Sequence, residues 1–390
     1  MDVAQLTQLL QRREVPFPYK RHYLRPAAEL LRSLAEQDYT EARAVEMLPA
    51  APRRGGRRAE DGLAPARHAE RNSKPPLLLS NPYRDGGYAM EFVTVPSAYG
   101  EVDVVGDHYT EEARMAARVR APAALSLGRP PRGAPQPRGA RAPRNASSQW
   151  LPSPAEYWAD PANAATLARA AGEWAKKHWL LSINGEAMRE AVYASVREAT
   201  QFRPSLAKAV CRYFGARRVL DFSAGWGDRA IGVAAAGADY LGLDPNPALV
   251  PGHARLIQDV ARWPGTRRIL PVPAEEYDPT ADPPPDLVFT SPPFFDFEVY
   301  SDDAKQSVRA HPAYADWRDR WLEPVLRKMY RALCPGGTFA LHINDIPGQS
   351  LTSDARRALS KEGAVFRGAI GCRTGTKRPI PLLVWKKPKN

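Results

Sequence analysis

Asp286-Leu287-Val288-Phe289-Thr290-Ser291-Pro292-Pro293-Phe294-Phe295 is the stretch of sequence that decides the fold. Its apolar first half predicts a buried strand. Ser291-Pro292-Pro293-Phe294 predicts a rigid turn at the end of that strand, because each proline ring holds the backbone φ angle near one value. In an open α/β sheet, ligands bind at the carboxyl ends of the strands, so this turn is placed where a substrate approaches.

Working outward from this stretch, strand and helix candidates alternate from about residue 200 to the end of the chain. The strand candidates are 217–222, 239–244, 268–273, 286–291, 337–343, 364–371 and 380–386, and the helix candidates are 205–214, 227–236, 247–262 and 314–333. The alternation indicates a parallel sheet covered by helices. Residues 372–379 are too few for a crossover helix, so the last two strands should form an antiparallel hairpin. This pattern predicts the α/β fold of the class I methyltransferases, a Rossmann-like seven-stranded sheet with a C-terminal antiparallel hairpin.

The composition favours a polyanionic partner. The 390 residues carry a net charge of +12, and cationic surface attracts phosphate, although arginines in solvated tails could supply this excess. The three cysteines, Cys211, Cys334 and Cys372, form no CxxC pair, so no metal site is expected. No apolar stretch is long enough to span a membrane, and no secretory signal is seen, so we expect an intracellular protein, cytoplasmic or, in a eukaryote, nuclear.

The sequence divides into three parts. Residues 1–127 are expected to form an N-terminal region of unknown role, with helices within 1–46, a linker at 47–76 and short strands at 92–95 and 102–105. Residues 128–148 form a Pro/Arg-rich linker. Residues 149–390 form the methyltransferase domain with a helical lead-in over 154–214. The 39 prolines, about twice the usual share, predict that the N-terminal region is partly disordered.

A second stretch, Val219-Leu220-Asp221-Phe222-Ser223-Ala224-Gly225-Trp226-Gly227-Asp228, predicts a strand that runs into a Gly-x-Gly loop. Gly225 and Gly227 allow the backbone to turn tightly and to approach a ligand. The dinucleotide fingerprint requires glycine at position 230, where this chain has Ala230, so binding of a pyrophosphate is disfavoured.

Acidic residues follow the next two strands. Asp244 closes the second strand, where a carboxylate can accept hydrogen bonds from both hydroxyls of a ribose. Glu275 or Glu276, after the third strand, is placed to meet an adenine amine or the ribose. The loop and Asp244 together indicate a nucleoside-containing cofactor, while a helix-capping glycine loop with solvent-exposed acids remains the alternative.

The residue types of the turn suit chemistry at an amine. An exocyclic amine on a nucleobase is conjugated with its ring and is a poor nucleophile. The Ser291 side chain and the Pro292 carbonyl can accept its two N–H bonds and orient its lone pair, and the two prolines keep the turn stiff. Phe294 can stack on a base turned out of its helix. The alternative is a structural role, in which a buried strand ends at the prolines and the aromatic side chain packs against its end.

The same residues carry a resemblance to a known family. Ser291-Pro292-Pro293-Phe294 matches the (Asp/Asn/Ser)-Pro-Pro-aromatic motif of the DNA amino-methyltransferases, which act on N6 of adenine or N4 of cytosine. The segments 224–229 and 290–301, with Gln306-Ser307 and a helix opened by Trp317, resemble phage and large-virus DNA methylases. The resemblance covers about residues 198–387. Phe294 stands where tyrosine is frequent, so stacking is retained and a phenol hydrogen bond is not.

The resemblance implies S-adenosylmethionine as cofactor and methyl transfer without a metal. Phe202-Arg203-Pro204-Ser205 resembles the family's motif that folds over the cofactor, although a helix N-terminus would also explain these residues. The residues assigned to catalysis are Ser291, Pro292, Pro293 and Phe294. The residues assigned to the cofactor are Phe202, Asp221, Ser223, Gly225, Gly227, Asp244 and Glu275. The serine form of the motif is commoner among cytosine-N4 enzymes, but the target base remains open.

We therefore predict a DNA amino-methyltransferase of the site-specific type, with DNA favoured over RNA as its partner and the oligomeric state unknown. An RNA base methyltransferase with the same site is one alternative. A non-catalytic nucleic-acid-binding module that retains the fold is another.

Further candidates for substrate-contacting residues carry a less specific signal. Asp296, Glu298 and Tyr300 line the base pocket or belong to a solvated loop, and Asn344 and Asp345 are better placed to touch substrate than His342.

Overall fold

The computed structural model describes residues 1–22, 24–36, 90–95, 102–120, 150–374 and 380–389, and the predicted linkers at 47–76 and 128–148 lie outside this part of the chain. The chain forms two compact units. Unit 1 comprises Met1–Leu24, Thr110–Thr200 and Phe295–Asp303, and unit 2 comprises Arg25–Tyr109, Gln201–Phe294 and Ala304–Asn390. The predicted domain division at 127 and 149 stays a prediction, and both units draw on the chain on either side of it.

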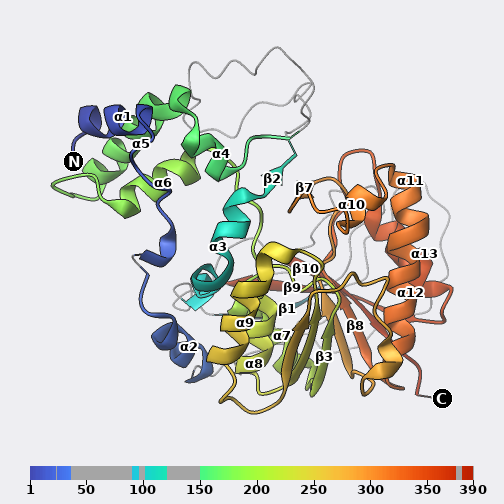
Figure 1. Ribbon diagram of the computed structural model, residues 1–390. Coiled ribbons are helices and arrows are strands. Elements are labelled where there is room, and N and C mark those ends of the chain that lie inside the picture. Colours follow the sequence, from blue (N-terminus) through green and yellow to red (C-terminus); the bar gives the residue numbers. More distant parts are fainter. Residues whose placement is uncertain (23, 37–89, 96–101, 121–149, 375–379, 390) are drawn as a thin grey trace, which may run out of the picture. The chain divides into compact units, whose positions relative to one another are not determined.

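Unit 2 contains an eight-stranded sheet with the order β1-β9-β10-β8-β6-β3-β4-β5 (Figure 1). The strands are β1 (Met90–Val95), β3 (Arg218–Asp221), β4 (Asp239–Leu243), β5 (Arg267–Leu270), β6 (Leu287–Thr290), β8 (Thr338–Leu341), β9 (Val365–Thr374) and β10 (Ile380–Lys386). Only β10 pairs antiparallel, with β8 and with β9. The seven strands from β3 onward have the order of the class I methyltransferase sheet, so the predicted fold and its closing hairpin are confirmed.

The sheet also contains a strand from the N-terminal region. β1 pairs in parallel with β9 and adds an eighth strand at that edge, which confirms the strand predicted at 92–95. The strand predicted at 102–105 is wrong, because residues 102–104 form a turn of 3-10 helix. The buried apolar side chains here are Val102, Val105 and Tyr109, and this spacing of three and four is helical, not alternating.

Helices cover the sheet on both sides, with α7 (Pro204–Phe214), α8 (Asp228–Ala235) and α9 (Val250–Asp259) on one side and α12 (Glu323–Ala332) and α13 (Leu351–Ser360) on the other (Figure 1). α7 begins with Pro204 at its first position and ends at Gly215 with φ of +60°. The helix predicted at 314–333 consists of α11 (Tyr314–Trp317), a π-helical turn η6 (Arg318–Leu322) and α12.

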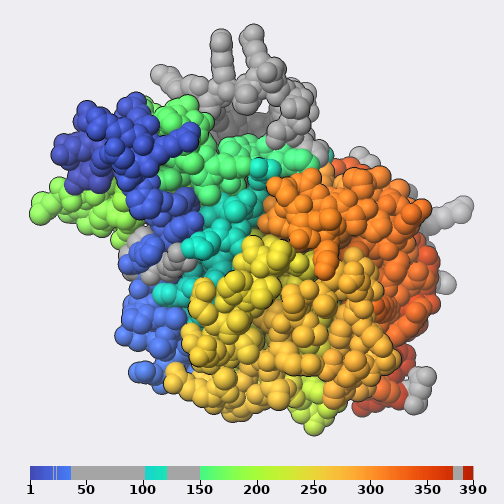
Figure 2. Space-filling view, in the orientation of Figure 1, coloured from blue at the N-terminus to red at the C-terminus, as the bar shows by residue number. Residues whose placement is uncertain are grey.

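Unit 1 is built on helices from two distant parts of the chain. α1 (Val3–Gln11) packs with α4 (Pro154–Ala159), α5 (Ala164–Lys177) and α6 (Gly185–Ser195) around one buried apolar cluster. The space-filling view shows the blue atoms of α1 against the green atoms of these helices (Figure 2). A two-stranded ladder of β2 (Arg118–Val119) and β7 (Glu298–Val299) also belongs to this unit. The helices predicted in 1–46 and 154–214 are confirmed.

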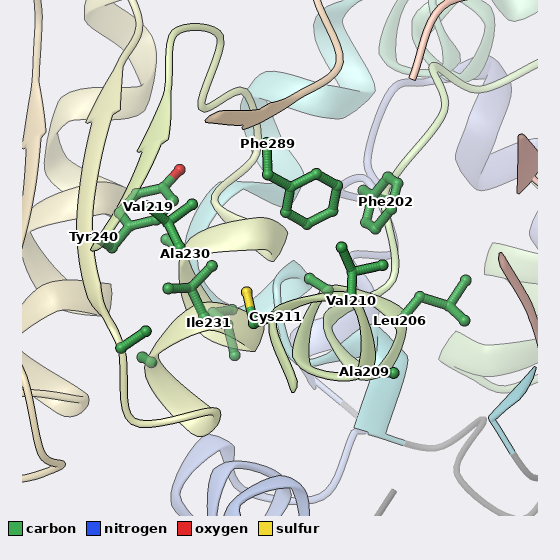
Figure 3. Packing of buried hydrophobic residues seen from close by; sticks show 14 of the residues in the cluster. Phe202, Leu206, Ala209, Val210, Cys211, Val219, Ala230, Ile231, Tyr240 and Phe289 are labelled. Atoms are coloured by element: carbon green, nitrogen blue, oxygen red, sulfur yellow. The ribbon is translucent and has the colours of Figure 1, made fainter. Parts of the chain in front are cut away.

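One apolar cluster packs α7 and α8 against the sheet of unit 2. Phe202 and Phe289 meet edge to face in it, with ring centroids 5.5 Å apart, and the cluster also contains residues of α7, α8 and the central strands (Figure 3). Leu30, Leu31 and Leu34 of α2 (Ala27–Glu36) belong to the same cluster. The N-terminal region therefore supplies part of the core that supports the sheet.

Among the residues that the structure describes, none of the helices combines the length and the apolar composition needed to cross a membrane.

We predict that Gly232→Ala lowers the free energy of unfolding by about 1–3 kcal/mol. A methyl group at Gly232 in α8 would overlap the carbonyl oxygen of Pro204 and lie 2.5 Å from the Cβ of Ala207, and the backbone of α7 has no room to withdraw. The control is Gly172→Ala in α5, where the nearest obstacle is a methyl of the exposed Val3 side chain. Urea denaturation measures both. Equal stability of the two variants would contradict the tight packing of α7 on α8.

Candidate active site

The carboxylate of Asp221, at the carboxyl end of β3, organises the site. It is completely buried. It accepts hydrogen bonds from Arg229 Nε (2.8 Å), the Tyr240 hydroxyl (2.8 Å) and the Thr290 hydroxyl (2.7 Å). It also accepts the backbone N–H of Ser223, at 3.2 Å. One carboxylate therefore holds the start of the glycine loop and the residue before Ser291.

Arg229 and Tyr240 compensate the buried charge. The guanidinium of Arg229 is nearly as buried as Asp221 and also donates to the Ser223 carbonyl. Burial, together with the charge of Asp221, raises the pKa of Tyr240 well above its ordinary value, so its hydroxyl remains a donor. Asp221 was predicted as a cofactor ligand. Its contacts are those of a residue that positions the loop, and its role toward a cofactor stays a prediction.

The glycine loop is held on both sides of Gly225. Its N–H donates to Oδ2 of Asp244 (2.9 Å), and its carbonyl accepts a hydrogen bond from Nε2 of His253 (2.8 Å). Both Gly225 and Gly227 have positive φ, +55° and +88°, a conformation that favours glycine. A Cβ at Gly227 would lie 2.7 Å from Leu256, whereas a Cβ at Gly225 would meet nothing closer than the Ser223 carbonyl at 3.8 Å. The loop therefore presents bare backbone to open space at Gly225.

His253 and Asn246 belong to this loop site and were not found from the sequence. Since the Gly225 carbonyl only accepts, His253 Nε2 carries the hydrogen, and burial lowers the pKa of His253. Asn246 donates its N–H to Asp244 (3.0 Å) and is 2% exposed. Its Nδ2 has no hydrogen-bond partner among the described residues. The Asp244-Pro245-Asn246 turn after β4 was the available signal for Asn246.

Two predicted site aromatics flank one histidine. The rings of Phe294 and Phe202 lie 5.6 Å and 6.2 Å from the ring of His342, both edge to face. His342 follows β8, its N–H donates to the Thr290 carbonyl (2.9 Å), and its Nδ1 donates to the Pro381 carbonyl (2.9 Å). Burial lowers the pKa of His342 to about 4, so the imidazole is neutral at pH 7. The structure thus brings the predicted turn and Phe202 to the same end of the sheet.

The Glu275 side chain contacts η6, and its role toward a cofactor stays a prediction. It is exposed, its Oε2 accepts the indole N–H of Trp321 in η6 (2.7 Å), and the described contacts do not link it to Asp244. Trp321 stacks on Trp317 at 5.3 Å between ring centroids. Trp317 in turn donates to the Ser307 hydroxyl (3.0 Å). This hydrogen bond therefore connects Trp317 and Ser307, two of the residues that carry the resemblance.

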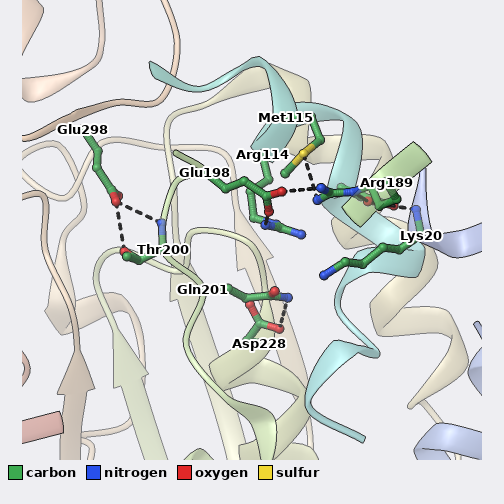
Figure 4. Close-up of polar contacts among 10 residues, drawn as sticks. Lys20, Arg114, Met115, Arg189, Glu198, Thr200, Gln201, Asp228 and Glu298 are labelled. Atoms are coloured by element: carbon green, nitrogen blue, oxygen red, sulfur yellow. Dashed lines mark hydrogen bonds and ion pairs between the residues drawn. The ribbon is translucent and has the colours of Figure 1, made fainter. Parts of the chain in front are cut away.

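The acids after the turn have partners within unit 1. Asp296 pairs with Arg120 at 2.6 Å. Glu298 accepts the N–H and the hydroxyl of Thr200 at 2.9 and 3.1 Å (Figure 4). Burial raises the pKa of Glu298. These buried, bonded side chains are unlike a solvated loop, and their place in a base pocket stays a prediction.

Asp345 and Asn344, the candidates after β8, differ from each other. Asp345 accepts the N–H and the hydroxyl of Thr352, each at 2.8 Å, and so caps the start of α13. Asn344 is partly exposed. The structure therefore gives Asp345 a helix-capping contact and leaves the side chain of Asn344 partly open to solvent.

The N-terminal segment 102–109 braces the helices next to the site. Arg203 precedes α7 and provides no side-chain cap. Asp103 supplies it instead, accepting the N–H of Ser205 at 3.0 Å. Gly106 approaches Asp228, the first residue of α8, so closely that a Cβ would overlap the Asp228 carboxylate, which also accepts Gln201 Nε2 at 3.0 Å (Figure 4). The sequence analysis missed this brace, because it joins residues about 100 positions apart.

Solved structures that resemble the chain include TrmN from Thermus thermophilus (23% identity, 48% of this chain and 49% of TrmN, TM-score 0.34). They also include a precorrin-6y C5,15-methyltransferase from Geobacter metallireducens (15% identity, 46% of this chain and 87% of that protein, TM-score 0.33). A third is magnesium protoporphyrin IX methyltransferase from Synechocystis with bound SAM (12% identity, 47% of this chain and 79% of that protein, TM-score 0.33).

The matched region thus spans about half of the TrmN chain. No protein-family model matches the sequence, and neither does any curated protein. The strand order of the chain itself defines the class of fold.

We predict that Arg229→Met destabilises the protein by about 3–5 kcal/mol, because it leaves the buried Asp221 carboxylate without its cation. The matched control is Arg331→Met, which breaks the Arg331–Glu362 pair, where the arginine side chain is 65% exposed. This change should cost about 1 kcal/mol or less. Urea denaturation at pH 7 measures both. Similar losses would mean that the Asp221 network does not anchor the site.

We predict that His342 lowers the free energy of unfolding in mild acid. The folded state keeps His342 neutral down to about pH 4, whereas the unfolded chain binds a proton near pH 6.5. The unfolded state therefore holds more protons in this range, and stability falls as the pH decreases from about 6.5 to about 4. In His342→Gln this fall should be smaller, as measured by urea denaturation between pH 4.5 and 7. The exposed His178→Gln is the control, and identical pH profiles for the wild type and His342→Gln would rule the effect out.

Proposed function

We propose that the protein transfers a methyl group from S-adenosylmethionine to an exocyclic amino nitrogen of a nucleic-acid base, with DNA as the favoured polymer. The observation that carries this proposal is the shared anchor of loop and turn. Asp221 binds both Ser223, at the start of the glycine loop, and Thr290, directly before Ser291. A cofactor on the loop and an amine on the turn would be held by one rigid, buried network, as methyl transfer between them requires.

The glycine loop suits a nucleoside cofactor. Open space beside Gly225 lets a ligand approach the backbone, and the Asp244 carboxylate is fixed by the N–H groups of Gly225 and Asn246. Each carboxylate oxygen can accept more than one hydrogen bond, so Asp244 retains acceptors for ribose hydroxyls. Asn246 Nδ2 adds a donor beside them. When bound, S-adenosylmethionine supplies a methyl group on a positively charged sulfur.

The turn suits an amine acceptor. Ser291 and Pro293 are partly exposed at the end of β6, and Thr290 before them is tied to Asp221. The Ser291 hydroxyl and the Pro292 carbonyl would accept the two N–H bonds of the amine and turn its lone pair toward the methyl group. Phe294 would stack on the base, with its ring braced by the neutral His342. A neutral amine needs no base before it attacks, in keeping with the low pKa of His342.

The experiment is methyl transfer from labelled S-adenosylmethionine to duplex DNA, single-stranded DNA and RNA, followed by mass spectrometry of the nucleosides. N4-methylcytosine or N6-methyladenine in DNA would support the proposal and identify the base. Label in RNA alone would replace DNA with RNA as the substrate. Cofactor binding without transfer to any polymer would overturn the proposal in favour of another acceptor or a non-catalytic role.

We predict that Ser291→Ala and Phe294→Ala each lower methyl transfer by at least about 100-fold, because the amine loses its orientation. Binding of S-adenosylhomocysteine, measured by calorimetry, should change little, since neither side chain belongs to the glycine loop. Ser360→Ala, at the exposed end of α13, is the control. Loss of cofactor binding together with activity would mean that the turn is structural.

A further inference from the structure

The connection between α5 and α6 holds an unusual aromatic residue. α5 ends in a Schellman motif, in which Leu180 donates its N–H to the Ala175 carbonyl (2.9 Å) and Trp179 donates to Lys176 (3.2 Å). The residue at the left-handed position of this motif is usually glycine, because a side chain there is strained. Here it is Trp179, with φ of +58°. The requirements of the turn therefore do not explain a tryptophan at this position.

Burial does not explain it either. The side chain of Trp179 is 92% exposed, and Leu181 is fully exposed. α5 buries its own apolar side, including Leu167 and Ala171, in the cluster of unit 1. In the space-filling view, the light-green atoms of this part of the chain lie at the edge of unit 1 (Figure 2). A strained and exposed Trp179, followed by two leucines, indicates a contact outside this chain. We call Lys176–Leu181 the tip.

The charges of the tip restrict the partner. Lys176 and Lys177 end α5, both are exposed, and neither has an ion-pair partner among the described residues. Glu173, one turn earlier, is the nearest acid in the sequence. A tryptophan face beside two free lysines matches the chemistry of a nucleic-acid strand, in which bases stack and phosphates are negative. A membrane surface fits less well, because interfacial binding requires a long apolar helix face and that of α5 is buried.

We propose that the tip is a nucleic-acid contact in which Trp179 stacks on, or inserts between, bases while Lys176 and Lys177 pair with phosphates. The choice of ligand rests on the proposed function, but the contact concerns binding and not methyl transfer. It adds to the protein a point of attachment outside the catalytic turn.

The test measures binding of the full chain to a fluorescent single-stranded oligonucleotide and its duplex over a series of salt concentrations. Trp179→Ala should weaken binding on the order of 10-fold and leave the salt dependence unchanged, because stacking involves no charge. Replacing Lys176 and Lys177 by glutamine should instead reduce the slope of log K against log salt by about 1 to 2. The control is Tyr193→Ala in α6, an aromatic side chain that is 63% exposed, which should bind as the wild type does.

A second variant excludes misfolding as the cause. Trp179→Gly should raise the unfolding temperature, since glycine adopts the left-handed conformation without strain, while it weakens binding as Trp179→Ala does. Wild-type affinity in both variants would overturn the inference. Trp179-dependent binding to phosphatidylserine vesicles with unchanged oligonucleotide affinity would assign the tip to membranes instead. Trp179-dependent oligonucleotide binding without methyl transfer would keep the inference and remove the proposed function.

Discussion

The buried carboxylate of Asp221 is the constraint on which the site depends. A carboxylate without solvent must be compensated by charge and hydrogen bonds, and here β4, β6 and α8 each contribute one side chain to it. Tyr240, Thr290 and Arg229 can reach Asp221 together only if the three parallel strands keep one register. The charge therefore specifies the relative positions of the glycine loop and the Ser-Pro-Pro-Phe turn.

Part of the N-terminal region packs on the helices and the sheet of unit 2. Lys208 of α7 is completely buried and donates its ammonium to the carbonyls of Leu34 (2.6 Å) and Ala35 (3.1 Å) at the end of α2. β1 extends the sheet, and Asp103 caps α7. The region that the resemblance leaves out thus supports the helix that follows Phe202. In the described part of the chain, its contacts with α7 and with the edge of the sheet give it a structural role.

The strands were predicted within a few residues of their observed bounds, because strands buried on both faces appear in the sequence as short apolar runs between turn residues. The segment 102–105 was assigned wrongly, since Val-Asp-Val-Val also alternates and only its neighbours showed the helical spacing. Gly225, Gly227, Asp244 and the turn lie at the carboxyl ends of strands as predicted, because strand order determines those ends. Glu275 follows the expected strand, but its contact with Trp321 depends on a helix about 45 residues later.

The sequence by itself determined the class of fold, the location of the glycine loop and the rigid turn after β6, because each depends on local spacing or on one backbone conformation. Only the tertiary structure decided which side chains serve those motifs. Arg229, Thr290, His253 and Asp103 have no distinguishing local pattern, and their roles arise from contacts between residues far apart in the chain. A buried charge or an uncapped helix end must find a partner in space, and the local sequence does not specify which residue will be near.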